Sequence, residues 1–315
     1  MLAIVSPGQG AQSPQMFGPW MADPRVSELL TSYSNFVGLD LIQLGTEATA
    51  DEIKQTQISQ PLIVAASLLS AQLLEFNQKE FGADSLIVAG HSVGEFVAAH
   101  LSGAISISNA LELVAARGNA MAKAASLNSQ TGMSAVLGGD KEAVISYLKE
   151  LDLIPANVNA AGQIVAAGLI SNLNKLAEAP APGSRVRQLD VSAAFHTEFM
   201  TSAKDDLRPI FENVTFEDPD VEILSNKNGK PVSSGNELRN LLLNQIDSPV
   251  RWDLCQKYLM DREITGLLEL APGGVLTGIA KREMPNVELF AIKSLLDIPL
   301  AKDFILRHTR VNVND

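Results

Sequence analysis

The chain has 315 residues, of which 46% are hydrophobic and 19% are charged. This composition supports a large core and excludes an intrinsically disordered chain. The formal net charge of −12 argues against a general nucleic-acid binder, because phosphate contacts need clustered lysine and arginine. The single cysteine, Cys255, excludes an internal disulfide.

The N-terminus shows no targeting segment. It lacks the basic region of a signal peptide, and its apolar run is too short for one. The most apolar stretch, residues 61–74, contains Ser and Gln and is shorter than the roughly 20 residues that span a membrane. We therefore expect a soluble, cytoplasmic protein. Met1 directly precedes the first predicted strand, which favours a stand-alone chain over a domain of a larger one.

The first part of the chain alternates predicted strands and helices. Short apolar runs that end at glycine-containing turns are typical of buried strands, and longer periodic runs are typical of helices. This alternation predicts a parallel α/β sheet. The predicted elements are a strand at 2–6, a helix at 61–76 with Pro61 in its first turn, a strand at 85–89, a helix at 93–101, and a helix at 109–125 capped by Ser108.

The middle of the chain has a different order of elements. The β-α-β-β-α-β order there is the ferredoxin-like pattern. We therefore predict a small ferredoxin-like domain at 130–192, inserted into a large α/β catalytic domain formed by 1–129 and 193–315. The predicted elements of the small domain lie at 133–137, 140–151, 154–158, 164–168, 171–178 and 185–191. A further strand of the large domain is expected at 267–270, before an Ala-Pro-Gly-Gly loop.

The sharpest local motif is Gly90-His91-Ser92-Val93-Gly94, a G-x-S-x-G sequence. An apolar strand precedes it and a helix follows, which is the context of a nucleophile elbow. In such a turn the serine hydroxyl is exposed at a helix N-terminus. The backbone N–H of Val93 then points at the oxygen of an attacked carbonyl. The alternative interpretation is an ordinary Gly-Ser turn that caps a helix.

A serine nucleophile needs a general base, and the chain has four histidines. His91 adjoins Ser92, and adjacent side chains usually point apart. His100 lies inside a predicted helix, and His308 lies near a C-terminal tail that is expected to fray. His196 follows a predicted strand end, so it is the best candidate base by elimination.

Arg117 is the most informative charged residue. It lies on the apolar stripe of the predicted 109–125 helix, together with Leu113, Val114 and Met121. A buried arginine needs an anion, and its planar fork suits a carboxylate. Two interpretations stay open, a structural pair with an internal acid such as Glu95 and a clamp for an acidic substrate group.

Signs of a nucleotide or metal site are weak. Gly8-Gln9-Gly10 after the first strand is similar to a dinucleotide fingerprint, but Ser13 replaces its third glycine. Backbone N–H groups in this loop can equally serve an oxyanion. No His/Cys cluster indicates a metal.

These motifs, taken together and in order, resemble the malonyl-coenzyme A:acyl carrier protein transacylase family, the acyltransferases of fatty acid and polyketide synthesis. The similarity covers nearly the whole chain. The matching segments are residues 7–12 (PGQGAQ), 90–95 (GHSVGE), Arg117-Gly118 with Met121, 158–163 (VNAAGQ), 194–196 (AFH), Gln245 with 249–252 (PVRW), and 272–278 (PGGVLTG).

The resemblance implies a fold and a set of roles. The fold is an α/β-hydrolase-like core with mainly parallel sheet and a ferredoxin-like insert. Asp247 stays open as an acidic third member of the catalytic group in place of Gln245. The implied roles are nucleophile for Ser92, base for His196, orientation of that base by the main-chain carbonyl of Gln245, oxyanion hole for the N–H groups of Gln9 and Val93, malonate binding for Arg117, and contacts to substrate for Phe195 and His91.

The resemblance also implies malonyl-coenzyme A as substrate and the phosphopantetheine of acyl carrier protein as acceptor, with no resident cofactor or metal. No membrane or nucleic acid is expected as a partner, and a monomer is compatible with the sequence. Because such carriers are acidic, docking needs a local basic patch, for which Lys281-Arg282 and Arg185 with Arg187 are candidates. Ordinary solvated charges are the alternative for these residues.

Three other functions share some of these sequence features. A serine esterase or patatin-like lipase shares the elbow and base but gives no reason for a buried Arg117. An acyltransferase domain of polyketide synthesis stays an alternative. A non-catalytic carrier-binding module does not account for an intact Ser92 and His196.

Overall fold

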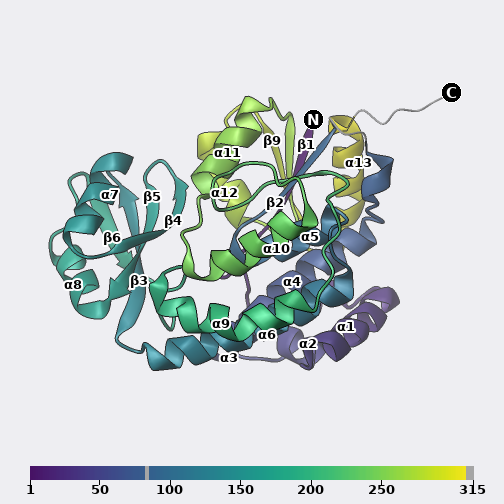
Figure 1. Cartoon of the computed structure of the whole chain (residues 1–315). Coiled ribbons are helices and arrows are strands. Elements are labelled where there is room, and N and C mark those ends of the chain that lie inside the picture. The colour runs from purple at the N-terminus through teal and green to yellow at the C-terminus, as the bar shows by residue number, and fades with distance from the viewer. Residues whose placement is uncertain (82–84, 310–315) are drawn as a thin grey trace.

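The protein contains a parallel sheet and a separate antiparallel sheet, and Figure 1 shows them side by side. The computed structural model describes residues 1–81 and 85–309. The parallel sheet has the strand order β7-β2-β1-β8-β9. The predicted α/β class with a parallel sheet is therefore confirmed. Its strands are β1 (Leu2–Ser6), β2 (Leu86–Gly90), β7 (Glu222–Ile223), β8 (Gly266–Glu269) and β9 (Glu288–Ala291).

Helices cover both faces of the parallel sheet. On β1, Leu2 and Ile4 face one apolar cluster, whereas Ala3 and Val5 face another. Two-sided burial explains why these strands are continuous apolar runs. The first cluster includes α1 (Pro24–Val37), α4 (Thr56–Leu73), α5 (Glu95–Leu101), α6 (Ile107–Leu127), α9 (Thr201–Glu212), α10 (Gly235–Asn244) and α13 (Ile298–His308), and the second includes α11 (Trp252–Asp261) and α12 (Val275–Glu283).

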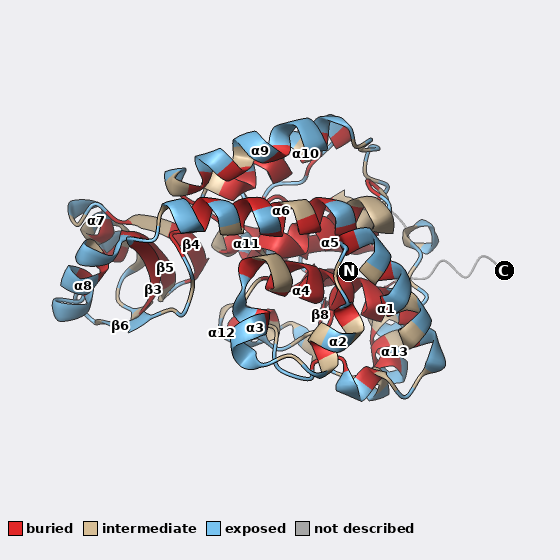
Figure 2. Ribbon diagram, turned by 90° about the horizontal axis from the view of Figure 1, so that it is seen from below, coloured by how far each residue is buried: buried red, intermediate tan, exposed pale blue. Residues whose placement is uncertain are grey.

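Two predicted helix starts were wrong. α4 begins at Thr56, so Pro61 lies inside the helix and not in its first turn. The helix is almost wholly buried, and Figure 2 shows it at the centre of the molecule, so its packing offsets the hydrogen bond that proline cannot donate. α6 is capped by Ser106 and not by Ser108, because Ser106 Oγ accepts the backbone N–H of Asn109 at 3.0 Å.

The antiparallel sheet has the strand order β4-β5-β3-β6. Its helices cover one face only, where Val144 and Leu176 pack against Val136 and Ile164. Figure 2 shows these helices on the outer side of the sheet. The predicted element order is confirmed, although the last strand ends three residues earlier than predicted. The elements are β3 (Thr131–Gly138), α7 (Lys141–Glu150), β4 (Ile154–Ala160), β5 (Gln163–Leu169), α8 (Ile170–Glu178) and β6 (Ser184–Gln188).

Backbone hydrogen bonds join the two sheets' regions. Val250 donates to Ala156 O at 2.8 Å, and Val158 donates to Val250 O at 2.9 Å. Strand β4 is thereby attached to the segment that precedes α11. The face of the antiparallel sheet that α7 and α8 leave open carries Met133, Ala135 and Val165, which line a cavity together with residues that follow β1 and β2.

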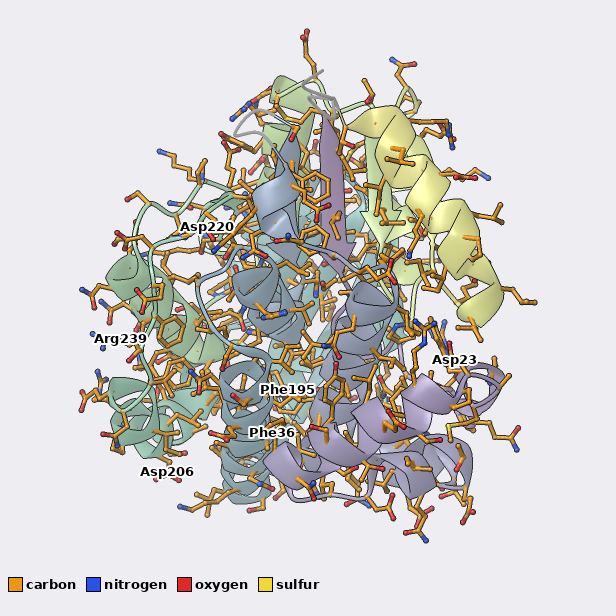
Figure 3. All side chains as sticks on the ribbon, turned by 90° about the vertical axis from the view of Figure 1, so that its right-hand side faces the viewer. Asp23, Phe36, Phe195, Asp206, Asp220 and Arg239 are labelled. Carbon is orange, nitrogen blue, oxygen red and sulfur yellow. The ribbon has the colours of Figure 1, made fainter. Side chains whose placement is uncertain are left out.

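Some elements were not predicted from the sequence. β7 and β9 lie at the two edges of the parallel sheet and are too short to show a clear period. The short helices α2 (Leu41–Thr46) and α3 (Ala50–Lys54) connect α1 to α4. Phe195 is buried, and Figure 3 shows charged residues such as Asp206 and Arg239 at the margin of the molecule. Among the residues described, no helix has both the length and the apolar character needed to cross a membrane.

Candidate active site

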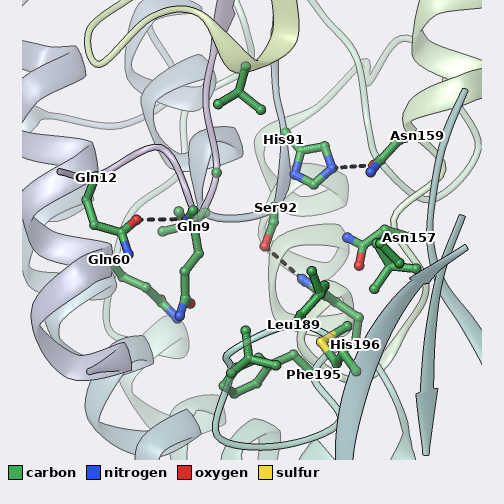
Figure 4. A pocket seen from close by; sticks show the side chains of 18 of the residues that line it. Gln9, Gln12, Gln60, His91, Ser92, Asn157, Asn159, Leu189, Phe195 and His196 are labelled. Atoms are coloured by element: carbon green, nitrogen blue, oxygen red, sulfur yellow. Dashed lines mark hydrogen bonds between the residues drawn. The ribbon is translucent and has the colours of Figure 1, made fainter. Parts of the chain in front are cut away.

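Two loops and the first turns of α12 meet where the parallel strands β1, β2 and β8 end. The carboxyl ends of parallel strands share one edge of a sheet, which is the usual place for a ligand site. A cavity of about 520 Å³ opens there, and Figure 4 shows it from close by. Its wall includes Gly8–Gly10 from the first loop, His91–Val93 from the second, and Met133, Ala135 and Val165 from the antiparallel sheet.

Ser92 stands on a sharp turn directly after β2. Its φ of 52° is left-handed, which is uncommon for a residue with a side chain. The turn is possible because two glycines flank it. A Cβ on Gly90 would lie 2.0 Å from the carbonyl carbon of Gly94, and one on Gly94 would lie 2.3 Å from Ser6 O. This strained strand–turn–helix geometry is that of a nucleophile elbow.

His196 lies within hydrogen-bond distance of the serine. Ser92 Oγ and His196 Nε2 are 2.7 Å apart, and His196 Nδ1 is 2.8 Å from the main-chain oxygen of Gln245. A carbonyl oxygen only accepts, so Nδ1 carries the proton and Nε2 is free to accept the serine proton. Asp247 is turned to Lys204 at 2.5 Å, so it does not take the place of the carbonyl.

The site keeps His196 neutral. Burial, together with the nearby cation of Arg117, lowers the pKa of His196 to about 3. A neutral imidazole at pH 7 is the form that can accept a proton. His196 also has a left-handed φ of 60°, so both members of the pair are held in uncommon backbone conformations.

The other histidines have different partners. His91 Nε2 lies 2.8 Å from Asn159 Oδ1, and its ring meets Trp252 edge-on at the cavity wall. His100 Nδ1 contacts Ile105 O at 3.0 Å. His308 ends α13 and lies 2.9 Å from Thr265 Oγ1 and 3.0 Å from Glu288 Oε2, whereas the tail that was expected to fray, from residue 310 on, lies outside the described residues.

Arg117 is buried beside the nucleophile, with only 1% of its surface exposed. Nη2 donates to Ser92 Oγ at 3.3 Å and to Gln245 Oε1 at 2.9 Å, and Nη1 donates to Gln60 Oε1 at 2.6 Å. Burial lowers the pKa of Arg117 to about 10, an effect that Glu95 partly opposes, so the guanidinium stays charged at pH 7.

Glu95 does not pair directly with Arg117. Its carboxylate accepts the backbone N–H of Asn226 at 2.5 Å and the side-chain amide of Gln245. Burial raises the pKa of Glu95 to about 8 against the effect of these hydrogen bonds and of Arg117. In the part of the chain that the structure describes, no carboxylate forms an ion pair with Arg117.

The remaining predicted residues lie around the same cavity. Gln9, Val93 and Phe195 line it, and Gln12 holds the first loop by accepting the N–H of Gly10 at 2.8 Å. Figure 4 shows Gln9 and Phe195 on different sides of Ser92. Arg187 also lines the cavity, and Arg185, Arg187, Lys281 and Arg282 are all exposed. No group of His, Cys, Asp and Glu within residues 1–81 and 85–309 is arranged to hold a metal ion.

Two residues of the site were missed by sequence reasoning. Asn226 Oδ1 accepts the backbone N–H of Ser92 at 2.8 Å, and its Nδ2 donates to Gly90 O at 2.7 Å. Gln60 holds Arg117. Asn226 lies in a Ser-Asn-Lys-Asn-Gly segment that reads as an ordinary turn, and Gln60 has no local signal, because each acts on a residue far away in the chain.

The arrangement suits covalent acyl transfer. A serine hydroxyl in contact with a neutral histidine can attack a carbonyl, and the adjacent guanidinium can bind an acidic group on the substrate. The fold and site define an acyl transferase, and the family model described as acyl transferase domain matches residues 4–297.

Named relatives narrow this class. A malonyl CoA-acyl carrier protein transacylase of Mycobacterium tuberculosis is 48% identical over 298 residues, which cover 95% of this chain and 98% of the relative. This chain belongs to the malonyl CoA-acyl carrier protein transacylase family.

Solved structures agree with this assignment. The crystal structure of MCAT from Mycobacterium tuberculosis matches with a TM-score of 0.91 and 46% identity, over 96% of this chain and 99% of that one. A second match is a malonyl-transacylase in complex with its type II PKS acyl-carrier protein. It has a TM-score of 0.88 and 30% identity, over 96% of this chain and 99% of that one.

Proposed function

We propose that this protein transfers the malonyl group of malonyl-coenzyme A to the phosphopantetheine thiol of acyl carrier protein through a malonyl-serine intermediate. The observation that carries the proposal is the joint contact of Ser92 Oγ with His196 Nε2 and Arg117 Nη2. The hydroxyl therefore lies between a neutral base and a buried cation, beside a cavity. The names of the relatives support the choice of donor and acceptor.

In the first half-reaction Ser92 Oγ attacks the thioester carbonyl while His196 Nε2 takes the hydroxyl proton. The N–H groups of Gln9 and Val93 stabilise the oxyanion of the tetrahedral intermediate. When the intermediate collapses, the C–S bond breaks, and the coenzyme A sulfur leaves with the proton from His196. The Gln245 carbonyl keeps the imidazole in the tautomer that this step needs.

In the second half-reaction the phosphopantetheine thiol gives its proton to His196 and attacks the ester carbonyl. The C–O bond to Ser92 then breaks, and the serine oxygen recovers the proton. One thioester is exchanged for another, so no redox change occurs, and no resident cofactor takes part in the proposed steps. Such a reaction has ping-pong kinetics.

Arg117 selects a carboxylated acyl group. Binding acetyl in place of malonyl leaves a buried guanidinium without its carboxylate, which the site penalises. Phe195 lines the same cavity, where a ring disfavours a branch on the acyl chain, and His91 contributes to the wall.

The two sheets belong to two parts of the fold. We assign the parallel part to an α/β-hydrolase-like core, formed by 1–129 and 193–315, and residues 130–192 to a ferredoxin-like insert. The strand order β4-β5-β3-β6 and the covering of one face by α7 and α8 support the second assignment. The cytoplasmic location and a monomeric state stay predictions.

For the carrier we assign the acyl carrier protein of fatty acid synthesis, with polyketide synthesis as the alternative that the second structural match supports. Lys281 and Arg282 are exposed on α12, whose first residue Val275 lines the cavity, which supports docking at this edge. Replacing both by Glu lowers the rate of transfer to the carrier, whereas the rate of malonyl-serine formation is unchanged. An unchanged transfer rate would show that the carrier docks elsewhere, for example at Arg185 and Arg187.

The proposal is tested by the intact mass of the protein after incubation with malonyl-coenzyme A. A malonyl adduct is expected on the wild type, none on Ser92→Ala, and much less on Arg117→Ala. Release of coenzyme A without an adduct would indicate a serine esterase, and neither adduct nor release would contradict acyl transfer. Transfer from the adduct to carriers of the two pathways then distinguishes fatty acid from polyketide synthesis.

A further inference from the structure

Arg117 is held by neutral amides and not by an acid. Gln60 Oε1 accepts from Nη1 at 2.6 Å, and Gln245 Oε1 accepts from Nη2 at 2.9 Å. Gln60 is 1% exposed and Gln245 is 5% exposed. Charged groups this deeply buried are normally paired with an opposite charge. Among the residues with described positions, none supplies one to Arg117.

Gln245 stands between Arg117 and the buried acid Glu95. Its Oε1 accepts from the guanidinium, and its Nε2 donates to Glu95 Oε2 and to the main-chain oxygen of Ser92 at 2.9 Å. An amide has one accepting end and one donating end, so it separates the guanidinium from the carboxyl group of Glu95 with both contacts satisfied. Burial raises the pKa of Glu95 to about 8, so this acid is mostly protonated at pH 7 and does not neutralise Arg117.

Gln60 likewise accepts a hydrogen bond from Arg117, at the other terminal nitrogen Nη1. Arginine only donates hydrogen bonds, so the amide oxygen of Gln60 must face it. The Nε2 end of Gln60 meets Met121 Sδ at 3.5 Å, which is a weak acceptor. The glutamine is therefore oriented by Arg117 itself and adds no charge to the site.

The guanidinium retains capacity for a further anion. Within the described residues its buried Nε has no hydrogen-bond partner, and both Arg117 and Gln60 line the cavity next to Ser92. We propose that Gln60 and Gln245 are specificity-determining residues, because their amides position the fork of Arg117 without neutralising it and so reserve its charge for a carboxylate on the acyl group. This inference rests on the proposed function and refines it.

The decisive variant is Gln60→Glu, which keeps the side-chain length and adds a carboxylate. Beside the cation this carboxylate is ionised and pairs with Arg117. The kcat/KM for malonyl transfer then falls by about 100-fold or more, whereas that for acetyl transfer falls by less than about tenfold. Gln60→Met has a similar length but adds no charge, so it raises KM for malonyl-coenzyme A and retains most of the preference for malonyl over acetyl.

Two further variants complete the test. Gln55→Glu adds the same charge at the exposed residue before α4 and leaves the preference unchanged. Gln245→Leu removes the bridging amide but retains the main-chain carbonyl on His196, and it also lowers the preference. This second variant decides the question if Gln60→Glu does not fold, as judged by thermal unfolding.

Either of two results would overturn the inference. One is that Gln60→Glu prefers malonyl over acetyl as strongly as the wild type does. If Gln60→Glu does not fold, the same result in Gln245→Leu counts instead. The other is an equal loss of preference in Gln60→Met and Gln60→Glu, which would indicate a packing effect. Failure of the proposed function is seen separately, because the wild type itself would then form no malonyl adduct.

Discussion

The side chain of Asn226 holds the backbone of Ser92 in its turn. Asn226 Oδ1 accepts the Ser92 N–H at 2.8 Å across a separation of 134 residues, and its Nδ2 donates to Gly90 O at 2.7 Å. The same residue donates its own N–H to Glu95 at 2.5 Å. The side chain and the backbone N–H of this one residue thus hold Gly90, Ser92 and Glu95 in place.

Asn226→Ala should therefore impair both the turn and the reaction. The buried N–H of Ser92 and the carbonyl of Gly90 lose their partner, which lowers the free energy of unfolding by about 1–3 kcal/mol. We expect the rate of malonyl-serine formation to fall by about tenfold or more, because the hydroxyl is no longer held against His196. Chemical denaturation and stopped-flow release of coenzyme A measure the two effects.

Asn228→Ala is the matched control. Asn228 is exposed in the same turn, where it accepts the N–H of Lys230 at 3.1 Å. Its loss should change the free energy of unfolding by less than about 0.5 kcal/mol and leave the acylation rate unaltered. Equal effects of the two substitutions would mean that Asn226 stabilises only its own segment, residues 225–229, and does not hold the backbone of Ser92.

The pH profile reports the environment of His196. Its pKa is lowered to about 3, so the free enzyme retains a neutral base well below pH 6.5. We expect kcat/KM for coenzyme A release, which reports the free enzyme, to change less than about twofold between pH 7 and pH 5. A loss by half near pH 6.5 would show an imidazole with an ordinary pKa.

The free energy of unfolding should also depend on pH, because the pKa of His196 differs between the folded and unfolded states. The unfolded chain binds a proton at His196 near pH 6.5, whereas the folded chain does so only near pH 3. The unfolded state therefore binds more protons between these values, and this residue's contribution to stability is lost as the pH falls through that window. Thermal unfolding of wild type and His196→Gln at pH 7.5 and pH 5 measures it, and the wild type should lose more stability on acidification.

The two elbow glycines permit no side chain. A Cβ on Gly94 would lie 2.3 Å from Ser6 O and 2.8 Å from Pro7 O, both of which are backbone atoms. Gly94→Ala must displace β1 or the elbow, so we expect a loss of more than about 3 kcal/mol of stability and no malonyl adduct. Gly278→Ala, where a Cβ meets no atom of residues 1–81 or 85–309 within 4 Å, should instead stabilise α12 by about 0.5–1 kcal/mol. Normal folding of Gly94→Ala would refute the close approach.

Glu269 supports the rim of the cavity. Its buried carboxylate accepts the N–H groups of Gly274 and Thr277, each at 2.8 Å, and that of Leu276 at 2.9 Å, which caps α12. Glu269→Ala leaves these donors unpaired and should lower the free energy of unfolding by about 2–4 kcal/mol.

A control lies in the same helix. Glu283, in the last turn of α12, is half-buried, so Glu283→Ala should change stability by less than about 0.5 kcal/mol. Denaturant titration of both variants checks the contrast, and equal stabilities of Glu269→Ala and the wild type would contradict the capping role.

The fold class and several site residues could be predicted from the sequence because their signals are local. The apolar run at residues 2–6 predicts a strand, and the small residues around Ser92 predict an elbow. Each pattern occupies only a few consecutive positions. Arg117 stood out because a charge on an apolar helix stripe is costly. The element order at 131–188 could likewise be predicted, because helices and strands differ in the period of their hydrophobic residues.

The tertiary structure alone decided what surrounds those residues. Gln60 reaches Arg117 across 57 residues, and Gln245 reaches it across 128, so no local pattern announces either contact. The position of Pro61 inside α4 has the same origin, since burial of that helix outweighs a local rule for proline. Local residue patterns thus identify the groups that can do chemistry, whereas the packing of distant segments leaves the charge of Arg117 unneutralised beside Ser92.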